Sequence, residues 1–440
     1  MFVYNMGESG ESMKDAWRVM EILETHGYPS YLVGGAVRDA LLGIEPQDYD
    51  LATAARPETV RDLFRDEVIA YRPKFGNVTL PGVEITTFRR DADYRDHRHP
   101  ARVIFVDTIE EDLARRDFTI GAMAYSEKRG FVDPYAGKKD LFEKKLVMIG
   151  DPARRLYEDA LRILRGIRFS ARFELVPEES FLNAAKEEAR YLSPKMRAEW
   201  ERILTGEHVA RALELMDETG ALDVLFPSVA RLRGLMQEGP FHEKDELHHT
   251  FDVVANTRAD FSLRLAALYH DVGKADTKFL DEKGYAHFYG HANRSEELFR
   301  ADMACVLSRK EIDGIAFLIR RHMSAVAPYS ERHLRRLVRE SSVEDALRLM
   351  ELVRADAAAT NFGVPEFLDD AVAFLKKPVE TKKERLVTGE DLIRIGYTPG
   401  PFLGQVLCEI EERLTDDSSR YTKEALLAYA RARKEEVNHG

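Results

Sequence analysis

Residues 31–53 read YLVGGAVRDALLGIEPQDYDLAT, and this stretch decides how the first part of the chain should fold. An apolar run enters Gly34-Gly35, a short amphipathic segment follows, and a second strand-like run, YDLAT, closes the stretch. The pattern predicts a strand, a turn, a helix and a second strand. Two carboxylates at positions i and i+2 of a strand point to the same face, so we expect Asp48 and Asp50 to lie together.

Paired carboxylates provide the hard oxygen ligands that Mg²⁺ prefers. Glu84 lies in VEITTFR between two apolar residues, so it should face the polar side of its strand and join the pair if the strands are neighbours. Three carboxylates around two Mg²⁺ ions are typical of in-line phosphoryl or nucleotidyl transfer. Gly34-Gly35 before a helix lets backbone N–H groups approach a triphosphate, and Arg38 lies one turn into that helix. Taken alone, this segment more often forms an ordinary turn and a solvated strand edge than a catalytic site.

The composition places the chain in a broad class. Its 440 residues, 44% of them hydrophobic, suffice for two to four domains. The two cysteines are far apart and lack metal-ligand spacing, which indicates a reducing compartment and excludes a disulfide scaffold. No apolar run reaches the roughly 20 residues of a membrane span, and the N-terminus does not resemble a signal peptide, so we expect a cytoplasmic protein.

Charge gives a weaker indication of the partner. The net charge of −12 argues against a general nucleic-acid coat protein. Residues 138–172 nevertheless contain ten Lys and Arg against five Asp and Glu, which makes this segment a candidate phosphate-facing surface. The same pattern would also suit a solvated helix face.

Strand-like and helix-like segments are mixed up to about residue 150, and helical patterns continue from there almost without interruption. We therefore predict an α+β fold, in which a head with a small mixed sheet precedes a mostly helical remainder. Charge and proline interrupt the apolar periodicity near residues 240 and 378. The expected domains are 1–150, 151–240, 241–378 and 379–440.

The motif EDALR suggests how a base could be recognised. Asp159 and Arg162 are three residues apart, so on a helix they would share one face. A carboxylate accepts from an exocyclic amine, and a guanidinium donates to a ring nitrogen. Cytosine and adenine present this amine beside an acceptor, whereas guanine and uracil present the reverse and would leave both side chains unsatisfied. The pair could thus select C and A without a template, although alone it could be a plain surface ion pair.

Together these motifs resemble the class II tRNA nucleotidyltransferase family, which includes the CCA-adding enzymes and the bacterial poly(A) polymerases. The resemblance covers roughly residues 30–205 and identifies LVGGAVRDALLG…DYDLAT as the metal and triphosphate motif and TFRRDADYRDHRHPARV as a flexible loop. It identifies RRDFTIGAMAY as the ribose-contacting motif and EDALRILRGIRFSARF as the base-recognition helix. Gly121 stands where the family usually has Asn, which changes the hydrogen bonding expected there.

The resemblance implies roles for individual residues of this chain. The catalytic residues would be Asp48, Asp50 and Glu84, with Mg²⁺ held by Asp48 and Asp50. The nucleotide would be bound by Gly34, Gly35, Arg38, Arg116, Asp117, Asp159, Arg162 and Arg165.

A second site is predicted further along the chain. Seven of the 13 histidines lie between residues 242 and 322. Six residues have the order of an HD phosphohydrolase domain: His249, His270, Asp271, His291, His322 and Asp356. Neutral imidazoles with a central carboxylate can hold a transition metal such as Ni²⁺, Co²⁺ or Mn²⁺ and leave a position open for water. The alternatives are a degenerate domain without metal and ordinary buried histidines.

The tail, LVTGEDLIRIGYTPGPFLGQVLCEI, resembles the C-terminal segment of bacterial CCA-adding enzymes. The domains would then be a nucleotidyltransferase head, a helical neck that contacts tRNA, an HD domain and a helical tail. The resemblance implies template-independent addition of C and A to the 3′ end of tRNA from CTP and ATP, with no DNA or membrane as partner.

Three other functions stay open. One is a partial-activity relative that adds only A or only CC; the full-length segment 89–102 argues against the CC-only form. Another is a poly(A) polymerase, although the chain lacks the basic C-terminal extension expected of one. The last is an HD phosphohydrolase with a non-functional transferase head. The sequence does not fix the oligomeric state.

Overall fold

The computed structural model describes most of the chain, in two compact units. The described residues are 11–46, 48–94, 97–98, 100–237, 245–325, 329–360, 363–377, 386–416 and 421–438. One unit comprises Met1–Arg321 with Ala358–Phe362, and the other comprises His322–Ala357 with Gly363–Gly440. The domain boundaries expected near residues 150, 240 and 378 stay a prediction.

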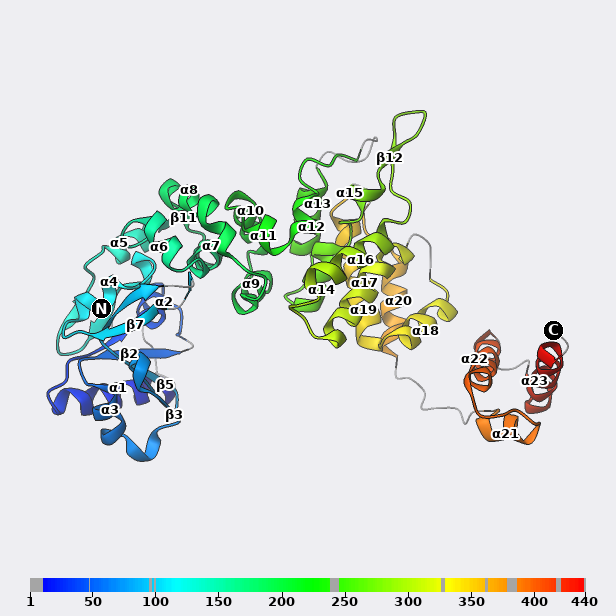
Figure 1. The fold of residues 1–440 in the computed structure, drawn as a ribbon, viewed down its shortest axis with the longest axis horizontal. Helices are drawn as coiled ribbons and strands as arrows, with labels where there is room; N and C mark the ends of the chain where they lie inside the picture. The colour runs from blue at the N-terminus through cyan, green and yellow to red at the C-terminus, as the bar shows by residue number, and fades with distance from the viewer. Residues whose placement is uncertain are drawn as a thin grey trace. The chain divides into compact units, whose positions relative to one another are not determined.

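A seven-stranded mixed sheet forms the centre of the head, in the blue and cyan part of Figure 1. Its strands, in spatial order, are β3 (Ala70–Arg72), β4 (Asn77–Leu80), β5 (Val83–Thr87), β2 (Tyr49–Thr53), β1 (Ser30–Val33), β8 (Ala124–Ser126) and β9 (Gly130–Val132). Neighbouring strands are antiparallel except β2 and β5, which are parallel. The predicted strand–turn–helix–strand order of residues 31–53 is present, with α2 (Gly35–Leu41) between β1 and β2.

Apolar side chains from segments far apart in the sequence of the head form one buried cluster with the sheet. Tyr31 and Val33 of β1 belong to a buried cluster that also contains Phe88 and Leu113. The short helical elements of the head are α1 (Glu11–Thr25), α3 (Pro57–Leu63), η2 (Arg65–Glu67), η3 (Pro73–Phe75), α4 (Ile109–Ala114), η4 (Thr119–Gly121) and α5 (Gly137–Phe142). This buried cluster includes Ala52 of β2 and so holds the strand that carries Asp50.

A separate two-stranded antiparallel sheet lies between β5 and α4 in the sequence. It consists of β6 (Arg89–Tyr94) and β7 (Pro100–Phe105). This is the segment that the family resemblance identifies as a flexible loop, and its described residues form a regular ladder from Arg89 opposite Phe105 to Tyr94 opposite Pro100. A short parallel pair, β10 (Lys145–Leu146) and β11 (Val176–Pro177), follows.

The rest of the first unit is almost entirely helical (Figure 1). Its elements up to residue 230 are α6 (Pro152–Glu158), α7 (Leu161–Phe173), α8 (Glu179–Glu188), η5 (Ala189–Tyr191), α9 (Arg197–Leu204), α10 (Val209–Glu218), α11 (Ala221–Leu225) and α12 (Pro227–Ala230). Beyond residue 245 they are α13 (Glu246–Ala255), α14 (Phe261–Tyr269), α15 (Lys274–Thr277), the hairpin of β12 (Phe279–Leu280) and β13 (Ala286–His287), α16 (His291–Met303) and α17 (Arg309–Arg321).

The prediction that EDALR lies on one helix is wrong. Helix α6 ends at Glu158 and α7 begins at Leu161, and Asp159 between them is extended, with φ −146° and ψ 98°. Asp159 and Arg162 are therefore not on successive turns of a single helix. Residues 158–162 contain no Gly or Pro, so the local sequence does not indicate that a helix ends here.

The second unit consists of helices. They are η6 (His322–Ala325), α18 (Glu331–Glu340), α19 (Val343–Ala358), α20 (Phe367–Lys376), α21 (Gly389–Arg394), α22 (Pro401–Asp416) and α23 (Lys423–Asn438). The glycine-rich segment GYTPGPFLG ends one helix and begins another, as its pattern indicates: Gly396 has a φ of +91° after α21, and α22 begins at Pro401. The α+β fold class is confirmed. Among the described residues, no helix has both the length and the apolarity of a membrane span.

Candidate active-site cleft and histidine cluster

Two carboxylates stand side by side on the central sheet. The parallel pairing of β2 with β5 places Asp50 directly opposite Glu84. The neighbours of each acid along its strand are buried, so alternation turns both carboxylates to the open face. Burial at the wall of the head raises the pKa of the Asp50 carboxyl, and the negative charge of Glu84 adds to the rise. Asp48 lies just before β2 and is exposed.

The backbone conformation favours glycine in the turn at the start of α2. Gly34 has a φ of +66°, a value that favours glycine. A Cβ at this position would lie 2.8 Å from Nη1 of Arg116. Gly34 thus allows the Arg116 guanidinium to approach the turn that was predicted to hold a triphosphate.

Neighbouring groups hold the guanidinium of Arg38 in place. Its Nε and Nη2 donate to Oδ1 of Asp39 at 2.8 and 2.7 Å. The guanidinium also lies over the ring of Phe173, 4.3 Å from its centroid. Burial lowers the pKa of Arg38, although the Asp39 carboxylate opposes this. These contacts fix the position of the charge.

A buried acid that sequence analysis did not select organises the arginines after α4. Asp112 is fully buried, and its carboxylate accepts from Nε of Arg115 at 2.9 Å and from Nη2 of Arg116 at 3.4 Å. Burial opposes ionisation, but the two arginines hold the pKa of Asp112 below its usual value. The spacing Asp-x-x-Arg-Arg at the end of a helix was the available signal, because residues at i+3 and i+4 face one another.

The two members of the EDALR pair have separate partners. Nε of Arg162 donates to Oδ1 of Asp117 at 2.8 Å, and Nη1 of Arg165 lies 2.7 Å from Oδ2 of the same carboxylate. Asp159 accepts the backbone N–H of Leu161 at 3.0 Å. Burial raises the pKa of Asp159 to about 6, although the positive charge of Arg162 opposes this.

These groups line one cleft of about 410 Å³. The predicted site residues along its wall are Gly34, Gly35, Arg38, Asp50, Glu84, Arg116, Asp117, Asp159, Arg162 and Arg165. Strand β6 adds three polar residues that the predictions omitted, Arg89, Asp91 and Tyr94, and the segment between β6 and β7 adds Arg98. Nη2 of Arg162 lies 3.4 Å from the Tyr94 hydroxyl. The cleft therefore combines an acidic wall, an arginine-rich wall and the Asp159–Arg162 region.

Gly121 also lines the cleft. Its carbonyl accepts from Nη1 of Arg116 at 3.3 Å, so the backbone provides a hydrogen-bond partner at the position where the family usually has Asn. A Cβ at Gly121 would meet no described atom within 4 Å, so the space beside it is open.

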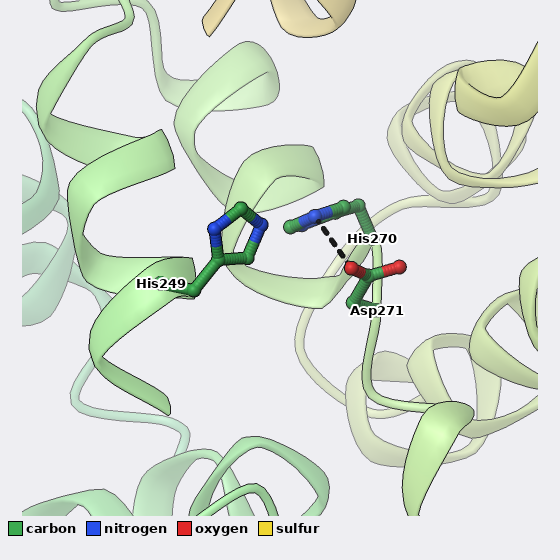
Figure 2. Close-up of side chains that lie close together, drawn as sticks. All are labelled: His249, His270 and Asp271. Atoms are coloured by element: carbon green, nitrogen blue, oxygen red, sulfur yellow. Dashed lines mark ion pairs between the residues drawn. The ribbon is translucent and has the colours of Figure 1, made fainter. Parts of the chain in front are cut away.

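A second group of polar side chains lies within the helical part of the first unit (Figure 2). His249 on α13, His270 after α14 and the adjacent Asp271 are buried, and one ligand atom from each lies within 4.8 Å of the others. Nε2 of His270 lies 3.0 Å from Oδ2 of Asp271. Nε2 of His291, the first residue of α16, lies 3.2 Å from Oδ1.

The tautomers of these rings follow from their other contacts. Nδ1 of His270 lies 2.7 Å from the carbonyl of Ala267, and Nδ1 of His291 lies 2.8 Å from the carbonyl of Phe288. Because a carbonyl only accepts, each neutral ring carries its proton on Nδ1 and presents the Nε2 lone pair toward Asp271. Lone pairs and a carboxylate that converge in this way are stabilised by a shared proton or by a cation.

Lys274 contributes a positive charge to this cluster. Its Nζ lies 2.8 Å from Oδ2 of Asp271 and 3.0 Å from Oε2 of Glu246. Burial opposes the charged form, but the two carboxylates raise the pKa of Lys274 above its usual value. His322 opens η6 and Asp356 lies in α19, both in the second unit, so their membership of the cluster stays a prediction.

Comparisons with known proteins identify the family of the chain. Residues 30–147 match the family described as "Poly A polymerase head domain", residues 195–232 match "Probable RNA and SrmB-binding site of polymerase A", and residues 341–430 match a tRNA nucleotidyltransferase domain 2. The chain is 30% identical to the CCA-adding enzyme of Streptococcus gordonii over 431 residues, which cover 96% of this chain and 98% of that protein. The chain belongs to the CCA-adding enzyme family.

Further members of the CCA-adding family show the same extent of similarity. The enzyme of Geobacillus stearothermophilus is 32% identical over 427 residues, which cover 94% of this chain and 96% of that protein. A crystal structure of the Bacillus stearothermophilus CCA-adding enzyme in complex with CTP superposes with a TM-score of 0.72 at 27% identity, covering 98% of this chain and all of that one. The predicted family and fold are therefore confirmed.

Proposed function

We propose that this member of the CCA-adding family adds C and A to the 3′ end of tRNA, with CTP and ATP as donors, in the cytoplasm. One observation carries the proposal: the facing carboxylates of Asp50 and Glu84 line the same cleft as Asp159 and Arg162. Acids suited to divalent metal and side chains suited to selecting C and A thus border one space that can hold a nucleotide.

The acidic wall fits Mg²⁺ by its chemistry. Asp50 and Glu84, which line the cleft, offer only carboxylate oxygens, the ligand type that Mg²⁺ prefers. Asp48, exposed just before β2, offers a third carboxylate outside the residues that line the cleft. Two like charges directly opposite each other on neighbouring strands are unfavourable without a cation. Mg²⁺ bound here would supply the charge that activates the tRNA 3′-hydroxyl and stabilises the departing pyrophosphate.

The arginine-rich wall is suited to the triphosphate. The backbone at Gly34-Gly35 faces the cleft beside Arg116, whose guanidinium is oriented by Asp112. Arg38 and Arg165 border the same space and are each held by a carboxylate. Charges fixed before the substrate binds need little reorganisation, so they stabilise the charge that develops during transfer.

Asp159 and Arg162 are the residues that we assign to base selection. Asp159 lies in the break between α6 and α7, Arg162 lies in the first turn of α7, and both line the cleft. The Asp159 carboxylate can accept from the amine of C or A, and Nη2 of Arg162 can donate to the ring acceptor in place of its 3.4 Å contact with Tyr94. G and U would leave both groups unsatisfied. The hydrogen-bond complementarity to C and A can therefore operate although Asp159 and Arg162 do not share one face of a helix.

The test resolves products to single nucleotides. tRNA transcripts that end at the discriminator base, at C and at CC are incubated with one labelled NTP at a time. Stepwise addition of C, C and A supports the proposal. Addition of A alone, of CC alone or of a long A tract would instead assign a partial-activity enzyme or a poly(A) polymerase.

The histidine cluster supports a second candidate function, a metal-dependent phosphohydrolase. The converging Nε2 lone pairs of His270 and His291 around Asp271, with His249 nearby, fit a transition metal such as Ni²⁺, Co²⁺ or Mn²⁺. We include His322 and Asp356 as further candidate ligands. Hydrolysis of phosphate esters by the metal-loaded protein, with 2′,3′-cyclic phosphates among the substrates tested, would establish this activity.

A further inference from the structure

His97 lies between β6 and β7 and contacts the helix break that carries Asp159. Its imidazole stacks on the ring of Tyr191, with centroids 3.8 Å apart and planes 19° apart. It meets the ring of Tyr157 edge-on, at 4.5 Å and 82°. Tyr157 and Tyr191 also meet edge-on, at 5.7 Å. Two rings, from α6 and η5, thus contact the imidazole and orient it.

Two hydrogen bonds join His97 to the backbone on both sides of Asp159. Nδ1 of His97 lies 2.7 Å from the carbonyl oxygen of Tyr157, and since a carbonyl only accepts, Nδ1 is the donor. The N–H of Ala160 donates to the carbonyl of His97 at 3.0 Å. The ends of α6 and α7 leave such groups without intrahelical partners. His97 thus supplies a hydrogen-bond partner for the Tyr157 carbonyl and another for the Ala160 N–H.

The backbone of His97 indicates that these contacts determine its conformation. Its φ is +55°, in the left-handed region that residues other than glycine seldom occupy. A residue remains in such a conformation only where its surroundings over-determine it. The stacking on Tyr191, the edge contact with Tyr157 and the two hydrogen bonds are the contacts that do so.

We propose that His97 is a positioning residue for nucleotide selection. By holding Tyr157 and Ala160, it fixes the extended backbone of Asp159 and so the direction in which that carboxylate meets the base. Tyr94, at the end of β6, also contacts Arg162, so the β6–β7 segment contacts one selecting residue directly and the backbone on both sides of the other. Loss of the His97 contacts therefore relaxes discrimination between right and wrong nucleotides and leaves the acidic wall intact. This inference rests on the proposed function of the cleft.

The experiment compares wrong with right nucleotides in matched variants. kcat/KM is measured for CTP and UTP on a tRNA ending at the discriminator base, and for ATP and GTP on a tRNA ending at CC. His97→Ala removes both the ring and its hydrogen bond, and Tyr191→Ala removes the stacking partner. Tyr191→Phe keeps the ring. His26→Ala is the matched control, because His26 is an exposed histidine whose Nδ1 also bonds to a backbone carbonyl, that of Ile22.

We expect His97→Ala and Tyr191→Ala to raise the wrong-to-right ratio about tenfold, since small displacements of a positioned group change rates strongly. Tyr191→Phe and His26→Ala should keep the wild-type ratio. Adding His97→Ala to Asp159→Ala should relax selection no further, because the two changes act through one carboxylate.

An unchanged ratio in His97→Ala, or an equal change in His26→Ala, would overturn the inference. Thermal unfolding of every variant separates loss of fold from loss of selection, because a merely structural role lowers the melting temperature and all rates without changing the ratio. If the wild-type protein itself adds neither C nor A, the proposed function fails, and that outcome is distinct from every result with the variants.

Discussion

Asp50 on β2 and Glu84 on β5 face each other across a parallel strand pair, and the two acids share the open face of the sheet. Two negative charges in this position repel each other. Nδ2 of Asn77 donates to Oε1 of Glu84 at 2.6 Å, which partly compensates for the repulsion. Burial raises the pKa of the Asp50 carboxyl, and the negative charge of Glu84 adds to the rise. The fold therefore maintains an unfavourable charge pair where the proposed chemistry needs a cation.

The first prediction concerns stability without nucleotide. In EDTA, Asp50→Asn should raise the melting temperature by about 2–4 °C, because it removes the repulsion with Glu84. Mg²⁺ should stabilise the wild-type protein and leave Asp50→Asn nearly unchanged. Thermal unfolding with EDTA and with Mg²⁺ measures both effects, and Asp66→Asn, an exposed acid of η2, is the control. A Mg²⁺ shift of wild-type size in Asp50→Asn would remove the metal assignment.

The second prediction concerns the reaction itself. Asp48→Ala and Asp50→Ala should each lower nucleotide addition about 100-fold or more, because metal charge and positioning supply the catalysis. tRNA affinity, measured by filter binding, should stay within about twofold of wild type, since phosphate contacts elsewhere determine it. Addition within tenfold of the wild-type rate in either variant would contradict the two-metal mechanism.

The third prediction assigns base selection. Asp159→Ala should allow incorporation of UTP and GTP and lower the rate with CTP and ATP. For Arg162 the charge-keeping change Arg162→Lys is the cleaner test, because removal of the charge would leave Asp117 buried beside Arg165 alone. Single-turnover incorporation of each of the four NTPs measures selection. If both variants lose rate but keep strict selection of C and A, the two residues are only structural.

The fourth prediction follows from the Asp159 pKa of about 6. A folded-state pKa above the unfolded value means that the native state prefers the protonated acid. The charged carboxylate therefore costs stability above pH 6, and this cost disappears as the pH falls toward 4. Asp159→Asn should be more stable than wild type by about 2 kcal/mol at pH 7.5 and equally stable near pH 4. Denaturant unfolding at both pH values measures the difference; an equal gain at pH 4 would exclude this cause.

Selection should show the same pH dependence in the wild-type protein. Below pH 6 the Asp159 carboxyl becomes protonated. It then lacks the negative charge that strengthens its hydrogen bond from the amine of C or A. The ratio of CTP to UTP incorporation should therefore fall between pH 7.5 and pH 5.5, while in Asp159→Asn the ratio should be low at both values. A constant ratio in the wild-type protein would show that this carboxyl does not select the base.

The fifth prediction separates the two sites. His270→Asn combined with Asp271→Asn should abolish stabilisation by Mn²⁺ or Ni²⁺ and any phosphohydrolase activity, because both substitutions remove metal ligands. Nucleotide addition with Mg²⁺ should stay within about twofold of wild type, since metal requirements follow ligand chemistry and the head offers carboxylates only. Melting temperature and both reactions are measured with each metal in turn. Loss of addition in a well-folded double variant would contradict two independent sites.

The sequence alone determined the features that depend on local pattern. Alternating and helical periodicities around residues 31–53 were sufficient for the order of the first elements, and the two-residue spacing of Asp48 and Asp50 indicated the acidic site. For Glu84, alternation along the strand predicted which face the side chain would occupy. It did not predict that the strand of Glu84 would pair with the strand of Asp50. The family and the α+β class were also determined by these motifs, and the comparisons confirmed both.

The tertiary structure decided the contacts that join distant segments. The pairing of β2 with β5 brings Asp50 opposite Glu84, and Arg162 pairs with Asp117 rather than with its near neighbour. The break at Asp159 could not be predicted, because the backbone groups that it leaves open are satisfied by His97, about 60 residues earlier in the chain. Local propensity describes only neighbours in sequence, whereas a break of this kind is stabilised by hydrogen bonds and ring contacts that form when the chain folds.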